Sequence, residues 1–351
     1  MRTMKVLLIT PASSYSIGKL LENSFSAAGH EVAACDPEKL IPRWKQHINI
    51  QAFRLPYRLR KPWEKSFYSH LNKKFVHWFE QEKPDIIMIY NDSMLLPETV
   101  QIFRKKARVV FYLGDNPYYT WNKPFFLNLL MQADYIFAPD TMWIEQLKML
   151  GIKNIYFEIL GWDRKHYFPN EPSCNERKKY TSDLLFIGNT YTTNWGYKRA
   201  LFLSRFANMD LKIYGSRHWN RWLSYFPELK KRFVLIAAPM GLDQVNTISN
   251  CCKLYPVDAN PGLLHGLHAR IFDCIGSGIL PLVEYRKDLD HVFKTMDIPK
   301  ITNYNEAQDV AQYYLDNENK RQELAKQLRQ YILENFLPEH ALKRMFERII
   351  P

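Results

Sequence analysis

The sequence predicts an α/β protein made of two Rossmann-like halves, each with a parallel sheet covered by helices on both faces. Short apolar runs alternate with segments of helical periodicity, which is typical of buried parallel strands joined by crossover helices. The alternation stops once, at a charged segment that contains prolines, and then starts again. At 351 residues the chain is long enough for two domains that each bury a core.

The first half opens with an apolar run that ends in Pro11 and continues in the same alternation. The predicted strands are residues 5–10, 31–35, 85–90, 109–113 and 135–138. Helical periodicity falls between them, at residues 17–28, 67–81, 96–105 and 142–150. Because the strands are short and mostly continuous in apolar residues, we expect them to be buried on both faces.

Residues 169–181 interrupt this pattern with Pro169, Pro172 and a run of charges, which predicts a linker between domains. The alternation then restarts with strands at 184–187, 211–214, 233–237, 254–257 and 279–283. Helices are expected at 197–207, 243–251 and 265–275, followed by an amphipathic helical tail at 318–350.

We therefore expect four parts along the chain. Residues 1–168 form an N-terminal Rossmann-like domain, 169–181 the linker and 182–335 a C-terminal Rossmann-like domain. Residues 336–351 form a C-terminal helix that could pack back on the first domain.

The charge of the chain favours anionic partners. Lys and Arg number 48 against 36 Asp and Glu, which gives a net charge of +12 and a pI near 9.3. Nucleotide diphosphates, anionic lipid headgroups, phosphorylated glycans and nucleic acid all fit this sign, and so does a generally basic surface with no specific partner.

The cysteines and the apolar runs favour a cytoplasmic protein. The five cysteines are odd in number and form no Cys-x-x-Cys pair, which argues against a disulfide framework or a zinc site. The apolar run at 6–9 is too short for a signal-peptide core, and no run approaches the ~20 residues that span a bilayer. Any membrane contact is therefore expected to be peripheral, at the inner face.

The first predicted ligand-binding loop follows the first strand of the second half. Gly188 and Asn189 come directly after the apolar residues 184–187, and a helix with Lys198 and Arg199 follows. Small residues there let backbone N–H groups approach a diphosphate, and the cations can reach it. The loop lacks a G-x-G-x-x-G pattern, and an ordinary strand-to-helix turn explains it equally well.

A second candidate segment runs from Asp258 to Gly278 and carries His265, His268, Arg270 and Asp273. His265 and Asp273 lie eight residues apart, about two helical turns, so both could face one side of a helix at 265–275. A carboxylate at such a helix can accept hydrogen bonds from the two hydroxyls of a ribose. Alternatively, Arg270 and Asp273 pair on the surface.

The segment 260–293, with Gly-Leu-His-Ala-Arg-Ile-Phe-Asp-Cys-Ile-Gly-Ser-Gly at 266–278, resembles the C-terminal domain of CgeB-like, spore-maturation-type glycosyltransferases. In that family an Arg-x-Phe-Glu-x-x-x-x-Gly segment recurs. Residues 186–199 and 212–215 resemble its glycine-containing loop, arginine helix and next strand, and 112–117 resembles its Asp-x-Pro turn. The likeness covers nearly the whole chain, and the order of the motifs carries more weight than any single one.

This resemblance implies a GT-B fold, in which two Rossmann-like domains face each other and the C-terminal one holds a nucleotide-sugar donor. It implies no cofactor beyond that co-substrate, and an acceptor bound by the N-terminal domain. The residues it places at the diphosphate, the base pocket and the pentose are Gly188, Asn189, Arg199, Tyr214, Gly215, His268, Arg270 and Asp273.

The aligned positions also show a departure from related retaining enzymes. Those families carry Glu-x7-Glu, whose second Glu binds the ribose, whereas this chain has His265 and Asp273. Asp273 could keep the ribose contact with a shorter reach. His265 remains a candidate sugar contact, and its replacement of an acid leaves the stereochemical outcome open.

An inverting transfer needs a base that takes the proton of the acceptor. Asp115 and Asp92, both after strands of the first half, are the candidates, and each also suits a turn or cap. Asp288 and Asp290 form an Asp-x-Asp string, but its place between a strand and a helix favours helix capping, so we infer no metal.

Residues 53–74 interleave basic and aromatic side chains, which suits a membrane surface, an anionic glycan or nucleic acid. Arg58, Arg60, Lys61 and Trp63 are the candidates for acceptor or membrane contact. A solvated helix face with its aromatics packed inward is the alternative.

Three functions compete on the sequence. The first is a glycosyltransferase that moves a hexosyl group from a nucleotide-sugar to a glycan, lipid-linked or protein acceptor in cell-surface glycan synthesis. The second is a nucleotide-sugar epimerase of the same fold. The third is a silent binding protein for an anionic glycan or nucleic acid, whose affinity would fall steeply with salt.

Overall fold

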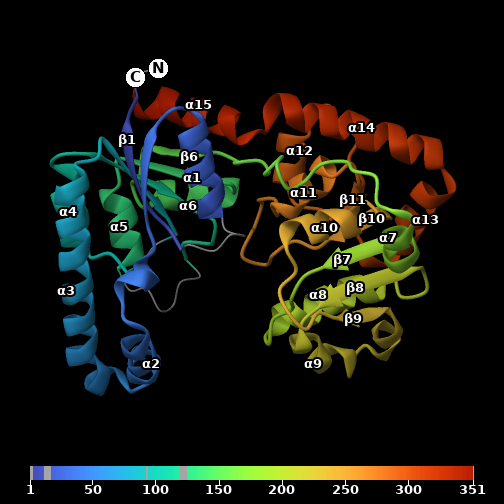
Figure 1. Ribbon diagram of the computed structural model, residues 1–351, viewed down its shortest axis with the longest axis horizontal. Coiled ribbons are helices and arrows are strands. Elements are labelled where there is room, and N and C mark those ends of the chain that lie inside the picture. Colours follow the sequence, from blue (N-terminus) through green and yellow to red (C-terminus); the bar gives the residue numbers. More distant parts are fainter. Residues whose placement is uncertain (1–2, 12–16, 92–93, 119–124, 351) are drawn as a thin grey trace. The chain divides into compact units, whose positions relative to one another are not determined.

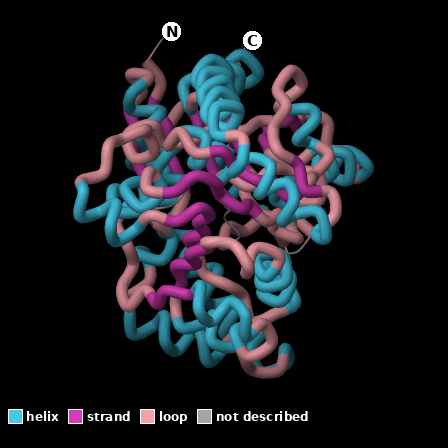
Figure 2. Tube along the Cα trace, turned by 90° about the vertical axis from the view of Figure 1, so that its right-hand side faces the viewer, coloured by secondary structure: helices cyan, strands magenta, loops and turns pink. Residues whose placement is uncertain are grey.

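The computed structural model describes residues 3–11, 17–91, 94–118 and 125–350. The chain divides into two compact units, each described here by itself. Unit 1 comprises Met1–Leu160 with Pro338–Pro351, and unit 2 comprises Gly161–Leu337. Figure 1 labels their elements, and Figure 2 distinguishes the strands, in magenta, from the helices that flank them.

Unit 1 contains a six-stranded parallel sheet in the order β2-β1-β3-β4-β5-β6. The register is continuous, with Val6 opposite both Val32 and Ile86. The strands are β1 Lys5–Ile9, β2 Glu31–Cys35, β3 Ile86–Tyr90, β4 Arg108–Tyr112, β5 Tyr135–Ala138 and β6 Ile155–Phe157. The central strands β1, β3 and β4 are almost wholly buried, as expected for a sheet covered on both faces.

The helices of unit 1 include one from the far end of the chain. They are α1 Ile17–Ala27, α2 Arg43–Ala52, α3 Tyr57–Glu82, α4 Pro97–Arg104, α5 Phe126–Gln132, α6 Thr141–Met149 and α15 Pro338–Ile349, with a short helix η1 at Pro37–Leu40. Helix α15 lies against α1 and buries Leu342, Met345 and Phe346 in the core of this unit. Burial of each such side chain contributes roughly 1.5–3 kcal/mol. Arg344 of α15 also donates to the buried carboxylate of Glu158, at 2.6 and 3.0 Å.

Unit 2 contains a second six-stranded parallel sheet, in the order β12-β11-β10-β7-β8-β9. Its strands are β7 Ser182–Ile187, β8 Leu211–Gly215, β9 Phe233–Leu235, β10 Cys252–Val257, β11 Leu280–Glu284 and β12 Lys300–Ile301. The chain adds β8 and β9 on one side of β7, then places β10, β11 and β12 on the other side. This reversal is a topological switch point, and it lies between β7 and β10.

The helices of unit 2 are mostly short, apart from the one that precedes α15. They are α7 Cys174–Tyr180, α8 Asn194–Ser204, α9 Asn220–Leu223, α10 Leu242–Ser249, α11 Arg270–Gly276, α12 Asp288–Val292, α13 Ala307–Asp316 and α14 Glu318–Asn335. Short 3-10 helices occur at η2 Arg217–Trp219, η3 Pro227–Arg232 and η4 Tyr304–Glu306. No helix of the described residues is long and apolar enough to cross a membrane.

The predicted fold class is confirmed: both sheets are parallel and Rossmann-like, and the chain ends in helices. The strands missed by the sequence, β6 and β12, have only three and two residues. Helix α3 begins ten residues earlier than expected and contains Pro62 as its sixth residue. Because proline has no N–H, the helix lacks one intrahelical hydrogen bond at that position.

Two expectations about boundaries are wrong. Residues 169–181, expected as a linker, lie inside unit 2 and contain α7, because Ser173 and Glu176 form a capping box that starts a helix there. The helix expected at 265–275 begins only at Arg270. Gly266 disfavours helix before that point, and Nδ1 of His268 accepts the hydrogen bond of the Arg270 N–H at 3.1 Å.

Candidate functional site

The carboxyl ends of β7, β8, β10 and β11 lie at one edge of the unit 2 sheet, and Gly188, Arg199 and Arg270 of the predicted residues meet there. In open α/β sheets ligands bind outside this edge, at the switch point. Here the residues that follow the strands are Gly188, Asn189, Ser216 and Asp258, with Glu284 as the last residue of β11.

Strands β7 and β10 stop pairing before they end. Their register includes Leu254 opposite Leu184, but beyond it the hydroxyl of Tyr255 takes the place of a backbone partner. That hydroxyl accepts from the N–H of Ile187 at 2.7 Å and donates to its carbonyl at 3.2 Å. The side chain therefore stands between the strand ends and satisfies the backbone of β7 where the ladder is open.

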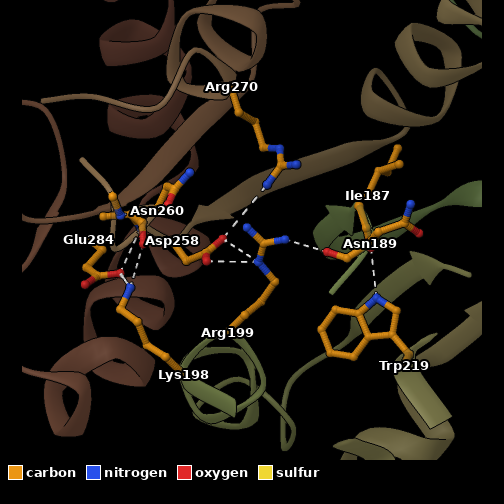
Figure 3. Close-up of polar contacts among 12 residues, drawn as sticks. Ile187, Asn189, Lys198, Arg199, Trp219, Asp258, Asn260, Arg270 and Glu284 are labelled. Carbon is orange, nitrogen blue, oxygen red and sulfur yellow. Dashed lines mark hydrogen bonds and ion pairs between the residues drawn. The ribbon is translucent and has the colours of Figure 1, made fainter. Parts of the chain in front are cut away.

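A buried ion pair lies across this opening (Figure 3). Nε of Arg199 donates to both carboxylate oxygens of Asp258, at 2.9 and 3.1 Å, and its Nη1 donates to the carbonyl of Asn189. Arg199 is 4% exposed and Asp258 2%. Burial alone would raise the pKa of Asp258, but Arg199 and Arg270 outweigh it and hold that pKa below its usual value. Arg199 thus fixes the loop after β7 to the strand end of β10.

Arg270 lies beside this pair, but its guanidinium makes weaker polar contacts than that of Arg199. Its Nη1 is 3.9 Å from a carboxylate oxygen of Asp258, beyond hydrogen-bond distance, and this buried atom has no hydrogen-bond partner. The guanidinium stacks on the ring of Phe186, 4.9 Å from its centroid. A Cβ at Gly188 would stand 2.9 Å from the other Nη, so the glycine leaves room for the arginine.

A second polar atom at the same edge is also unpartnered. Thr190 follows Asn189 in the loop after β7 and is buried, and its hydroxyl has no hydrogen bond to any described residue. Buried polar groups are normally satisfied, because an unmade hydrogen bond costs about 1–3 kcal/mol. Thr190 in the loop after β7 and Arg270 at the start of α11 each therefore have a donor that an acceptor from a ligand could satisfy.

The loop after β10 is anchored by a second buried ionic network (Figure 3). The ammonium of Lys198 pairs with the carboxylate of Glu284 and donates to the carbonyl of Ala259 at 2.7 Å. The same carboxylate accepts from the N–H of Ala259 at 2.8 Å, and Arg286 lies 3.3 Å from its other oxygen. Burial lowers the pKa of Lys198 although Glu284 opposes the shift.

Trp219 holds the loop after β7 from the other side. Its indole N–H donates to the carbonyl of Gly188 at 2.8 Å, and the residue is fully buried. A Cβ at Gly215 would stand 2.3 Å from this ring, so only glycine fits there. The sequence predicted Gly215 as a pocket wall, and the structure adds that its lack of a side chain admits Trp219. Tyr214 is buried with its ring 6.5 Å from that of Tyr180.

Asp273 on α11 and His268 in the loop before it both have shifted pKa values. Burial raises the pKa of Asp273 to about 7, although Arg270 opposes the shift. Burial and Arg270 lower the pKa of His268 to about 3. Because Nδ1 of His268 accepts from the Arg270 backbone, the neutral ring carries its proton on Nε2 and can donate from there.

His265 is not on the helix where the sequence placed it. It lies in the loop before α11, and its carbonyl accepts from the N–H of Asp288 at 3.0 Å. The two-turn spacing to Asp273 therefore has no structural meaning, and the pair does not share a helix face.

In unit 1, Asp115 lies in an exposed turn after β4, held by Asn91 at the end of β3. The side-chain carbonyl of Asn91 accepts from the N–H groups of Gly114 and Asp115 at 2.6 and 3.2 Å, and its amide donates to the Asp115 carboxylate at 2.8 Å. Asn91 has a φ of 49°, a left-handed conformation that asparagine tolerates. Asp92, the other candidate base, lies outside the described residues.

The remaining candidates lie elsewhere. Arg58, Lys61 and Trp63 are exposed on α3, while Arg60 donates to the carbonyl of Phe53 at 3.2 Å. The aromatic side chains of residues 53–74 do not all pack inward, since Tyr57 and Trp63 are exposed. The expectation of a solvated helix face with inward-packed aromatics is therefore not met.

The Asp-x-Asp string lies in the first turn of α12 rather than at its cap. The cap position is Lys287, and Asp290 binds Lys300 and the hydroxyl of Tyr285. The carboxylates are favourable there because they face the positive end of the helix. Within the described part of the chain, no group of three His, Cys, Asp or Glu residues could hold a metal ion.

Several residues of this site were not predicted from the sequence. Asp258 and Glu284 each end or follow an apolar strand, and that position of a carboxylate is a signal that could have identified them. Tyr255 and Trp219 gave no such signal, because their polar atoms bind backbone groups more than thirty positions away.

Comparison with known proteins supports the same class of fold. Residues 198–347 match the family described as Glycosyl transferase-like. No curated protein matches the sequence. The structure resembles sucrose-phosphate synthase from Thermosynechococcus elongatus, with a TM-score of 0.72, 12% identity and 98% of both chains covered. It also resembles the Anabaena protein HepE in complex with UDP-glucose, with a TM-score of 0.66, 11% identity and 98% of both chains covered.

A further similar structure is named for a different type of reaction. It is a Listeria monocytogenes protein provisionally assigned as a UDP-N-acetylglucosamine 2-epimerase, with a TM-score of 0.60, 13% identity and coverage of 99% of this chain and 96% of that one. At such identities the likenesses establish the GT-B fold, and the reaction must be argued from the site.

Proposed function

We propose that this protein is a glycosyltransferase that takes a sugar from a nucleoside-diphosphate sugar, held by unit 2, and transfers it to an acceptor held by unit 1. The observation that carries the proposal is the guanidinium of Arg270. It is half-buried at the switch point and has a buried, unpartnered Nη1, next to a glycine that leaves room for it. A diphosphate oxygen supplies the missing acceptor and the negative charge.

The charge balance of the edge supports a dianionic group. Among the described residues, Lys198, Arg199, Arg270 and Arg286 form ion pairs with two carboxylates, Asp258 and Glu284, and Asp273 acts on Arg270 from farther away. The excess of positive charge lies where water is largely excluded, so an anion binds there more strongly than on the open surface.

The roles of the neighbouring residues follow from their placement. The backbone of Gly188 and Asn189 and the hydroxyl of Thr190 are assigned to the diphosphate, together with Arg270. Arg199 acts through the loop, because its Nε and Nη1 already bind Asp258 and Asn189.

The nucleoside end of the donor is assigned to α11 and the loops around it. Asp273 is assigned to the ribose, and neutral His268 offers an N–H to the donor. His265 contacts the sugar from its loop, and Gly215 with Tyr214 borders the base.

In the transfer, the acceptor oxygen bonds to the anomeric carbon as the bond from that carbon to the diphosphate breaks. Arginine and backbone N–H groups stabilise the departing charge. On an inverting course Asp115 takes the acceptor proton, and the amide of Asn91 holds its carboxylate in place. The proposal needs no metal to neutralise the leaving group.

The wider assignment follows the resemblance of residues 260–293 to CgeB-like glycosyltransferases, with Arg270, Phe272 and Asp273 in the recurring segment. We place the protein in the cytoplasm, acting on a glycan, lipid-linked or protein acceptor in cell-surface glycan synthesis, with a hexosyl donor. Binding of UDP-glucose by HepE is consistent with that donor class.

A panel of nucleotide-sugars tests the proposal directly. Wild-type protein should release free nucleotide from at least one donor, while Arg270→Ala should release far less. Arg221→Ala is the matched control, since Arg221 is an exposed arginine of unit 2 that stacks on Trp222. Sugar interconversion without acceptor would identify an epimerase, and donor binding without either reaction would identify a binding protein. Either result would refute the transferase.

A further inference from the structure

Seven large apolar side chains are exposed within one short stretch of unit 1. We call this the α2–α3 surface, after α2, the start of α3 and the turn between them. Leu59 is 67% exposed and Trp44 60%. The full set is Trp44, Ile48, Ile50, Leu55, Tyr57, Leu59 and Trp63. Soluble proteins rarely leave so many large apolar residues together, and such patches mark an interaction site.

The exposure is not a sign that these helices lack structure. The indole N–H of Trp63 donates to the side chain of Asn49 at 2.9 Å, and this joins α3 to α2. The ring of Phe53 packs edge-on against that of Phe67, with centroids 5.5 Å apart. The two helices are therefore fixed to each other, while the apolar side chains of this surface remain exposed to solvent.

The same stretch is strongly cationic. Residues 43–65 contain one acidic side chain, Glu64, which pairs with Arg60 at 3.4 Å. The other basic residues are Arg43, Lys45, Arg54, Arg58, Lys61 and Lys65, and no described carboxylate forms an ion pair with them. Lys45 lies over the ring of Trp44 at 5.3 Å, so cationic and apolar groups are interleaved.

We propose that the α2–α3 surface binds an anionic phospholipid membrane. Tryptophan and tyrosine suit the headgroup level, isoleucine and leucine enter the acyl boundary, and lysine and arginine bind the anionic headgroups. Each class of side chain on the surface then has a partner in one bilayer.

Two other occupants explain the surface less well. Nucleic acid would use the cations and stack on the aromatic rings, but it offers nothing to Ile48, Leu55 and Leu59. A second copy would bring two cationic patches together in a two-fold interface, with only Glu64 on each side to offset the repulsion. A bilayer satisfies both the charge and the apolar area.

Vesicle co-sedimentation tests this without any sugar donor, so its result is independent of the transferase assignment. The probe is vesicles of equal parts phosphatidylcholine and phosphatidylglycerol, compared with phosphatidylcholine alone. We expect binding to the anionic vesicles, at least tenfold weaker binding to the neutral ones, and weakening by salt. Absence of binding to the anionic vesicles would refute the proposal.

Paired variants distinguish vesicle binding by the α2–α3 surface from binding through the general positive charge of the protein. Arg58→Glu with Lys61→Glu should weaken anionic-vesicle binding at least tenfold, and so should Trp44→Ser with Leu59→Ser. The controls are Lys105→Glu with Lys106→Glu, the same charge change after α4, and Met149→Ser, an apolar residue 86% exposed on α6. Controls that weaken binding as much as the paired variants would contradict the proposal.

Light scattering tests for a second copy on this surface, and oligonucleotide binding tests for nucleic acid. A dimer in free solution that Leu59→Ser dissociates would show that a second copy covers the surface. Binding of a single-stranded oligonucleotide that the Arg58→Glu, Lys61→Glu pair abolishes, with vesicle binding unchanged, would show a nucleic-acid site. Either result would overturn the membrane assignment.

Discussion

The two sheets share a principle of construction but differ at their carboxyl edges. In unit 1, β2 lies on one side of β1 and the later strands lie on the other. In unit 2, β8 and β9 lie on one side of β7, and β10, β11 and β12 lie on the other. Each sheet therefore has a switch point beside its first strand. At the unit 1 edge the neutral side chain of Asn91 holds the turn that carries exposed Asp115. At the unit 2 edge buried arginine, lysine and carboxylate groups hold the loops.

This difference teaches that topology provides the position of a site and the residues after the strands provide its chemistry. A neutral hydrogen-bonded turn can present one carboxylate to an acceptor. A buried ionic network with one partly free arginine can hold a diphosphate. Mutations at the two edges should therefore change different quantities.

The largest effect is expected at the unit 1 edge. Asp115→Ala should lower kcat by about 10²–10⁴-fold, the usual contribution of a general base, and leave the donor Kd unchanged. Steady-state kinetics with saturating donor measure the first, and calorimetry the second. A kcat within a few-fold of wild type would show that Asp115 is only a turn residue bound to Asn91.

At the unit 2 edge, Arg199→Ala should destabilise the fold rather than the donor complex alone. It leaves Asp258 buried without its partner, which costs roughly 3–5 kcal/mol. Urea unfolding measures the loss. Replacing both partners, Arg199→Met with Asp258→Leu, should recover most of it, and a double variant as unstable as the single one would contradict this explanation.

Arg270→Ala is expected to weaken donor binding and leave the stability of the fold nearly unchanged. Its Nη1 makes no hydrogen bond in the free protein, so the unfolding midpoint should change little. The donor Kd should rise about 10- to 100-fold, as for loss of a charge-assisted hydrogen bond of roughly 1.5–3 kcal/mol. Titration calorimetry with a nucleoside diphosphate decides this, and an unchanged Kd would remove Arg270 from the site.

Asp273→Ala should raise the donor Kd by about tenfold, the value of one good charged hydrogen bond. Because the pKa of Asp273 is raised to about 7, the carboxylate that we propose accepts from ribose forms only as the pH passes that value. Wild-type affinity should therefore increase between pH 6 and pH 8. The variant should lack this increase, and equal pH profiles would assign the titration to another group.

The smallest effect concerns the stability of the free protein. A carboxyl whose pKa is raised on folding, here from 3.8 to about 7, stabilises the fold below the lower value and loses that contribution as the pH rises through the higher one. Asp273→Asn should therefore raise the melting temperature at pH 8 by roughly 2–4 °C, as for about 1 kcal/mol, and have less effect at pH 5. A lower melting temperature at pH 8 would contradict the buried-carboxyl explanation.

The sequence by itself determined the local parts. Runs such as 86–89 and 184–187 are apolar throughout, and their length and composition specify buried strands regardless of what lies beside them. The loop after β7 could also be identified locally, because glycine and asparagine at 188 and 189 are residue types that suit a turn.

Only the tertiary structure decided which charges pair and which remain available. Arg199 and Asp258 are 59 positions apart, and Lys198 and Glu284 are 86 apart, so the order of the strands determines their contact. Arg199 and Arg270 are the same residue type and both were predicted as phosphate ligands, yet one is held by a carboxylate and the other keeps a free nitrogen. The physical reason is that strand and turn propensities act over a few residues, whereas the pairing of a buried charge depends on every element packed around it.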